Sequence, residues 1–213
     1  MIELQKSPDQ YLLRDAVLEF SLRFVADRWQ HAVSVRHDDS WRPVLISDEG
    51  CPTDAVLCSP AFQDLRFEQP AEGIFEFQLM GQSGKGVYSA AVRLDAAERM
   101  LDFDLCARGP ATDPALCTAS TYRLAGDGPL PNARVEGGTA IIGTVDGCSI
   151  RIIPVPIVGS PPNECRLAGE AHDRRLTVGC FETSVSNQAG ASVSAGKTRS
   201  IRWRQRMTVS GQP

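Results

Sequence analysis

The sequence has no apolar run of about 18 residues, the length that a membrane-spanning helix needs. Its N-terminus, Met1 to Lys6, also lacks the basic-then-apolar order of a secretory signal peptide. We therefore expect a cytoplasmic protein with no membrane partner. An excess of positive charge is missing too: the net charge is −4, which argues against a general nucleic-acid-binding protein.

The motifs that mark common catalytic and metal sites are also missing. There is no Gly-x-Ser-x-Gly sequence, so a hydrolase nucleophile elbow has no support. The glycine-rich stretch 81–86 departs from a phosphate-binding loop, because Leu79 stands where the first glycine belongs and Gly86 where Ser or Thr belongs. The seven cysteines include no pair at two-residue spacing and there are only three histidines, so we expect no metal and no cofactor.

The cysteine count fits a reducing compartment, since it is odd and follows no disulfide framework. Cys51 and Cys58 are close enough in the sequence to pair if the protein were exported. Otherwise the cysteines are expected to be reduced. Cys106 and Cys180 lie in apolar, strand-like stretches, where we expect them to act as small core residues.

What the sequence does contain is alternation: several segments place apolar and polar residues in turn, with a period of two. This pattern is typical of half-buried antiparallel strands, and no long helices alternate with them. The segments are a hairpin over 20–35 with a turn at 27–28; 41–46; 62–68; a meander over 74–80, 87–94 and 99–107; 116–124; 135–144 and 149–155 around a turn at 146–147; 165–171 paired with 176–181; and 200–209.

We therefore predict an all-β, mainly antiparallel fold of roughly ten to thirteen strands. A two-layer β-sandwich is the expected architecture, with a closed barrel as the alternative, and the chain fits a single domain over 1–213. Residues 184–197 are small and without pattern, which predicts a mobile loop. One short helix is predicted over about residues 8–15, because Ser7 can cap it, Pro8 suits its first position and Gln10 follows the cap by three.

The last strand carries the clearest candidate binding surface. Arg202, Arg204 and Arg206 fall on one face, opposite Trp203 and its apolar neighbours. At ~3.3 Å per residue these guanidinium groups form a stripe about 13 Å long, suited to carboxylate, phosphate or sulfate groups. The alternative is a solvated sheet face on which the arginines pair with carboxylates of another strand, such as those of Asp102 and Asp104.

Acid–base candidates are few. Asp102 and Asp104 share a strand face, Glu76 belongs to a neighbouring strand, and paired carboxylates can divide acid and base roles. His31 has the parity of the inward-facing residues of its strand, and His172 lies between two predicted strands. A half-buried histidine beside carboxylates can be a general base, whereas an ordinary charged surface and structural histidines are the alternative.

Four aromatic residues could stack on a sugar ring, because a ring buries a large area at low entropic cost. They are Trp29, Trp41, Tyr88 and Trp203. Core packing is the alternative role for each. Together with the arginine stripe, they make a carbohydrate or another anionic small molecule the ligand class that the sequence favours.

The hairpin 20–35, the meander ending at 101–106 and the final strand 201–207 resemble those of a bacterial all-β protein family of the planctomycete type. The meander and the closing strand of alternating arginine and aromatic residues also resemble the β-supersandwich of galactose-mutarotase-like and glycoside-hydrolase-associated domains. This second resemblance covers the strand pattern only, and the catalytic His and Glu of those domains have no matching positions here. It implies a supersandwich-like fold and a carbohydrate ligand, not an activity.

Three hypotheses follow for the function. The first is a β-sandwich that binds a carbohydrate or other anionic small ligand through Arg202, Arg204, Arg206, Trp203, Trp29 and Trp41. The second is a sugar epimerase or lyase, which requires a histidine and a carboxylate to converge in a concave pocket. The third is a protein-interaction or assembly module, and a homo-oligomer would fit it.

Overall fold

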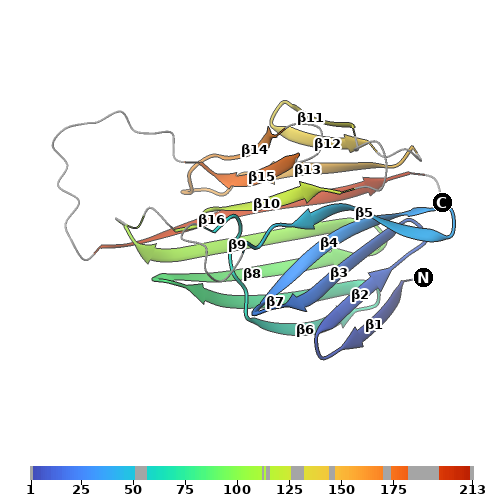
Figure 1. Ribbon diagram of the computed structural model, residues 1–213, viewed down its shortest axis with the longest axis horizontal. Helices are drawn as coiled ribbons and strands as arrows, with labels where there is room; N and C mark the ends of the chain where they lie inside the picture. The colour runs from blue at the N-terminus through green and yellow to red at the C-terminus, as the bar shows by residue number, and fades with distance from the viewer. Residues whose placement is uncertain are drawn as a thin grey trace.

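The computed structural model describes residues 2–50, 57–111, 113, 116–125, 132–143, 147–169, 174–181 and 197–211. These residues form sixteen β-strands and no helix, in two antiparallel sheets of eight strands that pack face to face (Figure 1). The predicted all-β sandwich is therefore confirmed. Because the described residues contain no helix, they include none that could cross a membrane.

The two sheets, which we name sheet A and sheet B, each join strands from distant parts of the chain. Sheet A has the order β1 (Glu3–Ser7), β2 (Gln10–Arg14), β3 (Leu18–Val25), β4 (Arg28–His37), β5 (Ser40–Ser47), β10 (Ala119–Leu124), β15 (Arg175–Cys180) and β14 (Asn163–Ala168). Sheet B has the order β11 (Asn132–Glu136), β12 (Thr139–Gly143), β13 (Ser149–Val155), β16 (Thr198–Ser210), β9 (Met100–Pro110), β8 (Gly86–Asp95), β7 (Ile74–Ser83) and β6 (Asp64–Ala71).

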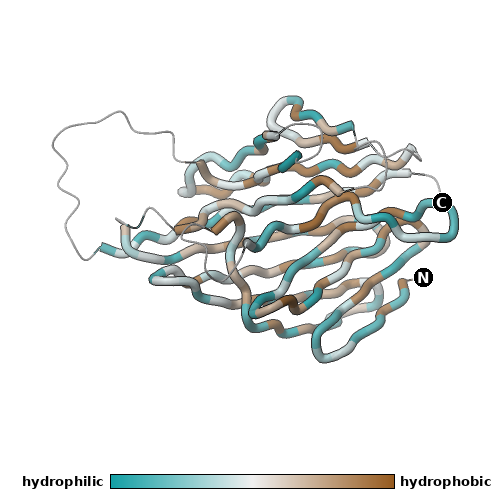
Figure 2. Tube along the Cα trace, viewed as in Figure 1, coloured by the Kyte–Doolittle hydropathy of each residue, from teal (hydrophilic) through white to brown (hydrophobic). Residues whose placement is uncertain are grey.

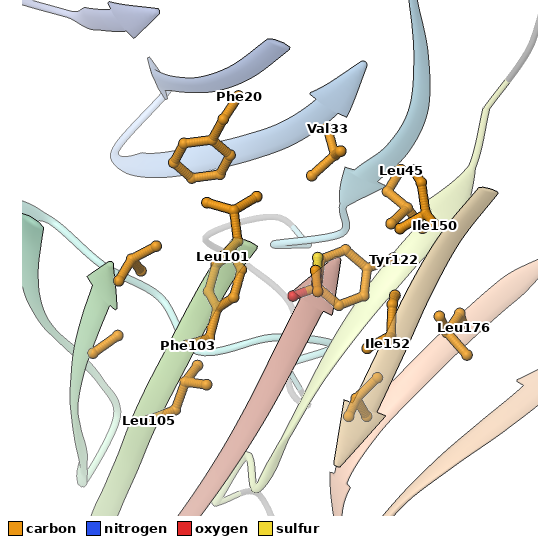
Figure 3. Close-up of a cluster of buried hydrophobic side chains, with 14 of the residues drawn as sticks. Phe20, Val33, Leu45, Leu101, Phe103, Leu105, Tyr122, Ile150, Ile152 and Leu176 are labelled. Atoms are coloured by element: carbon orange, nitrogen blue, oxygen red, sulfur yellow. The ribbon is translucent and has the colours of Figure 1, made fainter. Parts of the chain in front are cut away.

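Alternation along each strand produces the core between the sheets. Hydropathy switches from residue to residue along the strands in Figure 2, and in β8 every second residue from Tyr88 to Leu94 is buried. Figure 3 shows side chains of the two inner faces approaching each other: Phe20 and Val33 come from sheet A, and Leu101 and Phe103 from sheet B. One continuous cluster of buried residues results.

The predicted N-terminal helix is wrong, because residues 10–14 form strand β2. Pro8 and Asp9 are the two loop residues of a hairpin in which Ser7 pairs with Gln10. The Ser7 hydroxyl donates to the Asp9 carboxylate over 2.7 Å, so the supposed cap stabilises a turn instead. Packing decides the outcome: the Tyr11 ring contacts the rings of Phe67 and Phe77 in sheet B.

A second difference concerns the predicted strand 135–144. Gly137 and Gly138 have φ values of +55° and +81°, and they separate β11 from β12 as the loop of a tight hairpin. The pairing of β14 with β15 agrees with the prediction. Cys180 is buried, whereas Cys106 points to the outer face of sheet B, where its Sγ lies 3.3 Å from Ser200 Oγ. The loop predicted over 184–197 lies, apart from its last residue, outside the described residues, and so does Cys51.

The connection from β5 to β6 carries the chain from sheet A to sheet B. Its described part, 57–63, is fixed at two points: Trp29 N donates to Phe62 O over 2.8 Å, and Ser59 Oγ bonds both backbone polar groups of Thr121. Gly81 makes the close packing possible, since a Cβ atom there would lie 2.0 Å from Ala61 O.

Candidate functional site

The arginine stripe lies on the outer face of sheet B and is paired with aspartates of β9. Arg206 Nε lies 2.8 Å from Asp102 Oδ1, and Arg204 Nη2 lies 3.2 Å from Asp102 Oδ2. Arg202 forms a two-pronged ion pair with Asp104, with Nε to Oδ1 at 2.7 Å. All three guanidinium groups thus have carboxylate partners. This is the arrangement expected for a solvated sheet face on which the arginines pair with carboxylates of another strand.

The charge pattern extends over further strands of sheet B. Arg93 of β8 stands opposite Asp102 and lies 3.6 Å from Glu76 of β7. Although partial burial raises the pKa of Asp102, the hydrogen bonds and charges of Arg206 and Arg204 bring it below its usual value. Positive and negative side chains therefore alternate across this face and offset one another. We call the set Glu76, Arg93, Asp102, Asp104, Arg202, Arg204 and Arg206 the charge ladder.

Two of the three candidate tryptophans are core residues. Trp203 is fully buried, and Trp29 is buried against the rings of Tyr11 and Phe24. Neither ring is placed where a ligand on the surface would reach it. Tyr88 is buried as well, and its hydroxyl accepts a hydrogen bond from Cys117 N. Core packing, the alternative weighed for these aromatics, describes their positions.

Trp41 is different, because it lines a groove of about 260 Å³ on the outer face of sheet A. Small residues make the floor of this groove: Ser21 of β3 stands opposite Ala32 of β4, and Ser34 lies two residues further along. Longer side chains of the same strands make its ends, with Arg23 at one end. The hollow follows from the sequence, since the outward side chains at the centre of β3 and β4 are smaller than those at the ends of these strands. We call it the sheet A groove.

The Trp41 end of the sheet A groove combines an aromatic ring with fixed polar groups. Glu19 is buried there and accepts hydrogen bonds from Arg14 Nε at 2.6 Å and from Ser34 Oγ at 3.1 Å. The guanidinium carbons of Arg14 and Arg36 lie 5.7 and 5.9 Å from the centre of the Trp41 ring. A half-buried ring beside two arginines results, and each arginine has a carboxylate partner, Glu19 for Arg14 and Asp39 for Arg36.

His31 faces the interior, as its parity indicated, and belongs to a buried polar cluster between the sheets. Its Nε2 lies 3.2 Å from Tyr122 Oη, which also accepts a hydrogen bond from Gln205 of β16. Its Nδ1 lies 3.7 Å from Oε1 of Glu49, which follows the last residue of β5 by two positions. Burial lowers the pKa of His31 to about 3 and raises that of Glu49 to about 8, so it favours the neutral form of both groups. We call His31, Glu49, Tyr122 and Gln205 the inner polar cluster.

The predicted acid–base pairing is not brought together. His31 lies on the inner face of sheet A, whereas Asp102, Asp104 and Glu76 point outward from sheet B, on the far side of the core. His172 lies outside the described residues. Within the part of the chain that the structure describes, no three His, Cys, Asp or Glu side chains approach closely enough to hold a metal ion.

Sequence reasoning missed Glu19, Ser21, Ser34 and Glu49. The sequence did contain a signal for the first three, because they occupy outward positions of the predicted hairpin 20–35 or its edge. Ser21 and Ser34 are also small, and small outward residues on paired strands leave a hollow. Glu49 carried no such signal, because it follows a strand in a polar stretch that is typical of an exposed loop.

No family model matches this chain, and neither does any curated protein. Solved structures do resemble it: two structures described as heparinase III, the first with methylated lysines, superpose with TM-scores of 0.55 and 0.56. Their sequence identities are 11% and 10% over 100% and 99% of this chain, which spans 36% of the length of each. At such identities the likeness shows a shared fold and transfers no site residue.

Proposed function

We propose that this β-sandwich binds a saccharide in the sheet A groove, with Trp41 as the apolar platform. The observation that carries the proposal is the combination of an accessible ring with hydrogen-bonding side chains around one hollow of about 260 Å³. Sugar rings offer an apolar face and a rim of hydroxyl groups, so a site that recognises them needs both kinds of contact. The fold shared with structures described as heparinase III is compatible with this ligand class.

The charges around the groove favour a saccharide that carries anionic groups. Arg23 is exposed and makes no ion pair within the described residues, so its guanidinium is available to a ligand. Arg14 and Arg36 also lie beside Trp41, but each already has a carboxylate partner, Glu19 for Arg14 and Asp39 for Arg36. A carboxylate or sulfate on the ligand would gain charge-assisted hydrogen bonds with Arg23.

Replacing the platform tests this location. Trp41→Ala is expected to weaken binding of the saccharide at least about tenfold, because removing a central aromatic anchor costs more than about 1.4 kcal/mol. A panel of neutral and acidic saccharides, screened by shift in melting temperature and followed by calorimetric titration, identifies the ligand and measures the loss. Met80→Ala is the matched control, since Met80 is an exposed apolar residue on the outer face of sheet B.

The charge ladder is the competing location, and Arg204→Ala separates the two. Binding in the sheet A groove predicts an unchanged affinity for Arg204→Ala. A wild-type protein that binds no member of the panel would overturn the function, and full affinity in Trp41→Ala with loss in Arg204→Ala would move the site to the ladder.

A further inference from the structure

The inner polar cluster contains a buried carboxyl oxygen that has no hydrogen-bond partner among the described residues. Glu49 is 4% exposed, and its Oε2 has no hydrogen-bond partner among the described residues. An unpaired polar atom in a low-dielectric interior costs free energy, so native proteins satisfy nearly all of them with protein groups or with ordered water.

A small cavity lies beside this carboxyl group. Its volume is about 10 Å³, close to the smallest that holds one water molecule. Its polar lining comes from Glu49, His31, Ser59 and Ser120. The rest of the lining is apolar: Leu22, Pro60, Phe62, Leu79, Ala90, Val92, Phe103 and Leu105.

We propose that this cavity is a binding site for one internal water molecule, which accepts a hydrogen bond from Glu49 Oε2. Ser59, which also lines the cavity, supplies the second partner. Ser59 Oγ donates to Thr121 O over 3.2 Å and accepts from Thr121 N over 2.9 Å, so one lone pair of its oxygen is left for a proton of the water. Glu49 and Ser59, which both line this small space, can thus serve as the donor and the acceptor for the water.

The surroundings keep the carboxyl group neutral. Arg28 is near, but its Nη1 bonds the backbone oxygen of Glu49 at 2.7 Å and not the carboxylate. His31 is itself neutral, so it brings no compensating charge. The Ser47 hydroxyl hydrogen-bonds the carboxyl group and lowers its pKa, but burial outweighs this effect. The other groups facing Glu49 are Asp48 beside it, Tyr122 from β10 and the Cys117 thiol, all neutral or negative, and sheet B lines the cavity with apolar side chains only. An ionised Glu49 would therefore be poorly compensated.

Infrared spectroscopy tests the protonation directly, because a carboxylic acid has a carbonyl band that a carboxylate lacks. At pH 6 the wild-type protein is expected to show this band and Glu49→Gln to lack it. Glu164→Gln, at an exposed carboxylate that is paired with Arg166, is the control and should leave the band in place. A spectrum without the band at pH 6 would overturn the proposal.

A crystal structure of the wild-type protein tests the water and does not depend on the folding of any variant. The proposal predicts one ordered water within hydrogen-bond distance of both Glu49 Oε2 and Ser59 Oγ. A cavity without such a water, or a direct bond between these two side chains, would contradict it. Neither experiment involves the sheet A groove, so its outcome is independent of saccharide binding.

Discussion

At the scale of single residues, the two buried titratable groups of the inner polar cluster act on stability in opposite directions. Glu49 has a pKa of about 8 in the folded protein against an ordinary value of 4.5, so unfolding releases a proton between these pH values and stability falls as pH rises. His31 has a pKa of about 3 against 6.5, so unfolding takes up a proton in that range and stability falls as pH falls.

These opposite slopes cancel between pH 4.5 and 6.5, so this pair predicts maximal stability there. Between pH 6.5 and 8 the Glu49 contribution alone should lower the free energy of unfolding by about 2 kcal/mol. Urea unfolding of wild type and Glu49→Gln across this range measures it. The variant should lose the alkaline decline and keep the decline in acid, and an identical pH profile in both proteins would refute the assignment.

The arginines of β16 and Trp41 illustrate how much of the candidate site could be predicted from the sequence. The parity of β16 correctly separated Arg202, Arg204 and Arg206 from Trp203. It could not say which aspartates those arginines meet, because the contact joins segments about a hundred residues apart. Trp41 was recognised as a stacking candidate from its type alone. Its position at a groove depends on the small residues of β3 and β4. The pattern within the Trp41 segment alone does not predict that these residues lie beside it.

At the scale of strands and turns, the charge ladder ties β16 to β9. Asp102 is 10% exposed in its side chain and bonds two arginines, whereas Asp104 is 24% exposed and bonds one. Hydrogen bonds from charged groups to a half-buried carboxylate contribute more than exposed ion pairs do. The two aspartates therefore differ in their expected contribution to stability, although they lie on one strand face.

We expect Asp102→Asn to lower the free energy of unfolding by about 1–2 kcal/mol and Asp104→Asn by less than about 1 kcal/mol. Chemical denaturation at low and high salt measures both, and salt should reduce the smaller effect most. Because the pKa of Asp102 is lowered, its contribution is present above its usual pKa and is lost as pH falls through the folded value. Equal losses in the two variants would contradict the ladder as described.

Two predictions, the N-terminal helix and the single strand 135–144, were wrong because the chain forms a tight turn in each segment. The sequence Ser7-Pro8-Asp9-Gln10 satisfies both a helix start and a tight turn, since proline suits the first position of either. Only the contact of Tyr11 with the rings of sheet B selects the turn. Gly137 and Gly138, in contrast, carried a local hairpin signal that a longer apolar segment concealed.

At the scale of the whole molecule, alternation was sufficient to predict a two-layer sandwich, because two half-apolar sheets must bury their apolar faces against each other. Alternation alone does not predict the order of the strands in each sheet. Strand β16 lies between β9 and β13, and β10 joins β5 to β15, so both sheets depend on pairings between remote segments. The outer faces then differ: sheet B carries matched charges, whereas sheet A carries a hollow with a half-buried tryptophan.

The indole NH signals of the three tryptophans report directly on binding in the sheet A groove, because Trp29 and Trp203 are buried and serve as internal controls. Nuclear magnetic resonance of the ¹⁵N-labelled wild-type protein is recorded with and without the saccharide that binds best. Binding in the sheet A groove predicts that the Trp41 signal shifts on saturation while the other two stay in place. A bound saccharide that leaves the Trp41 signal unmoved would contradict binding in the sheet A groove.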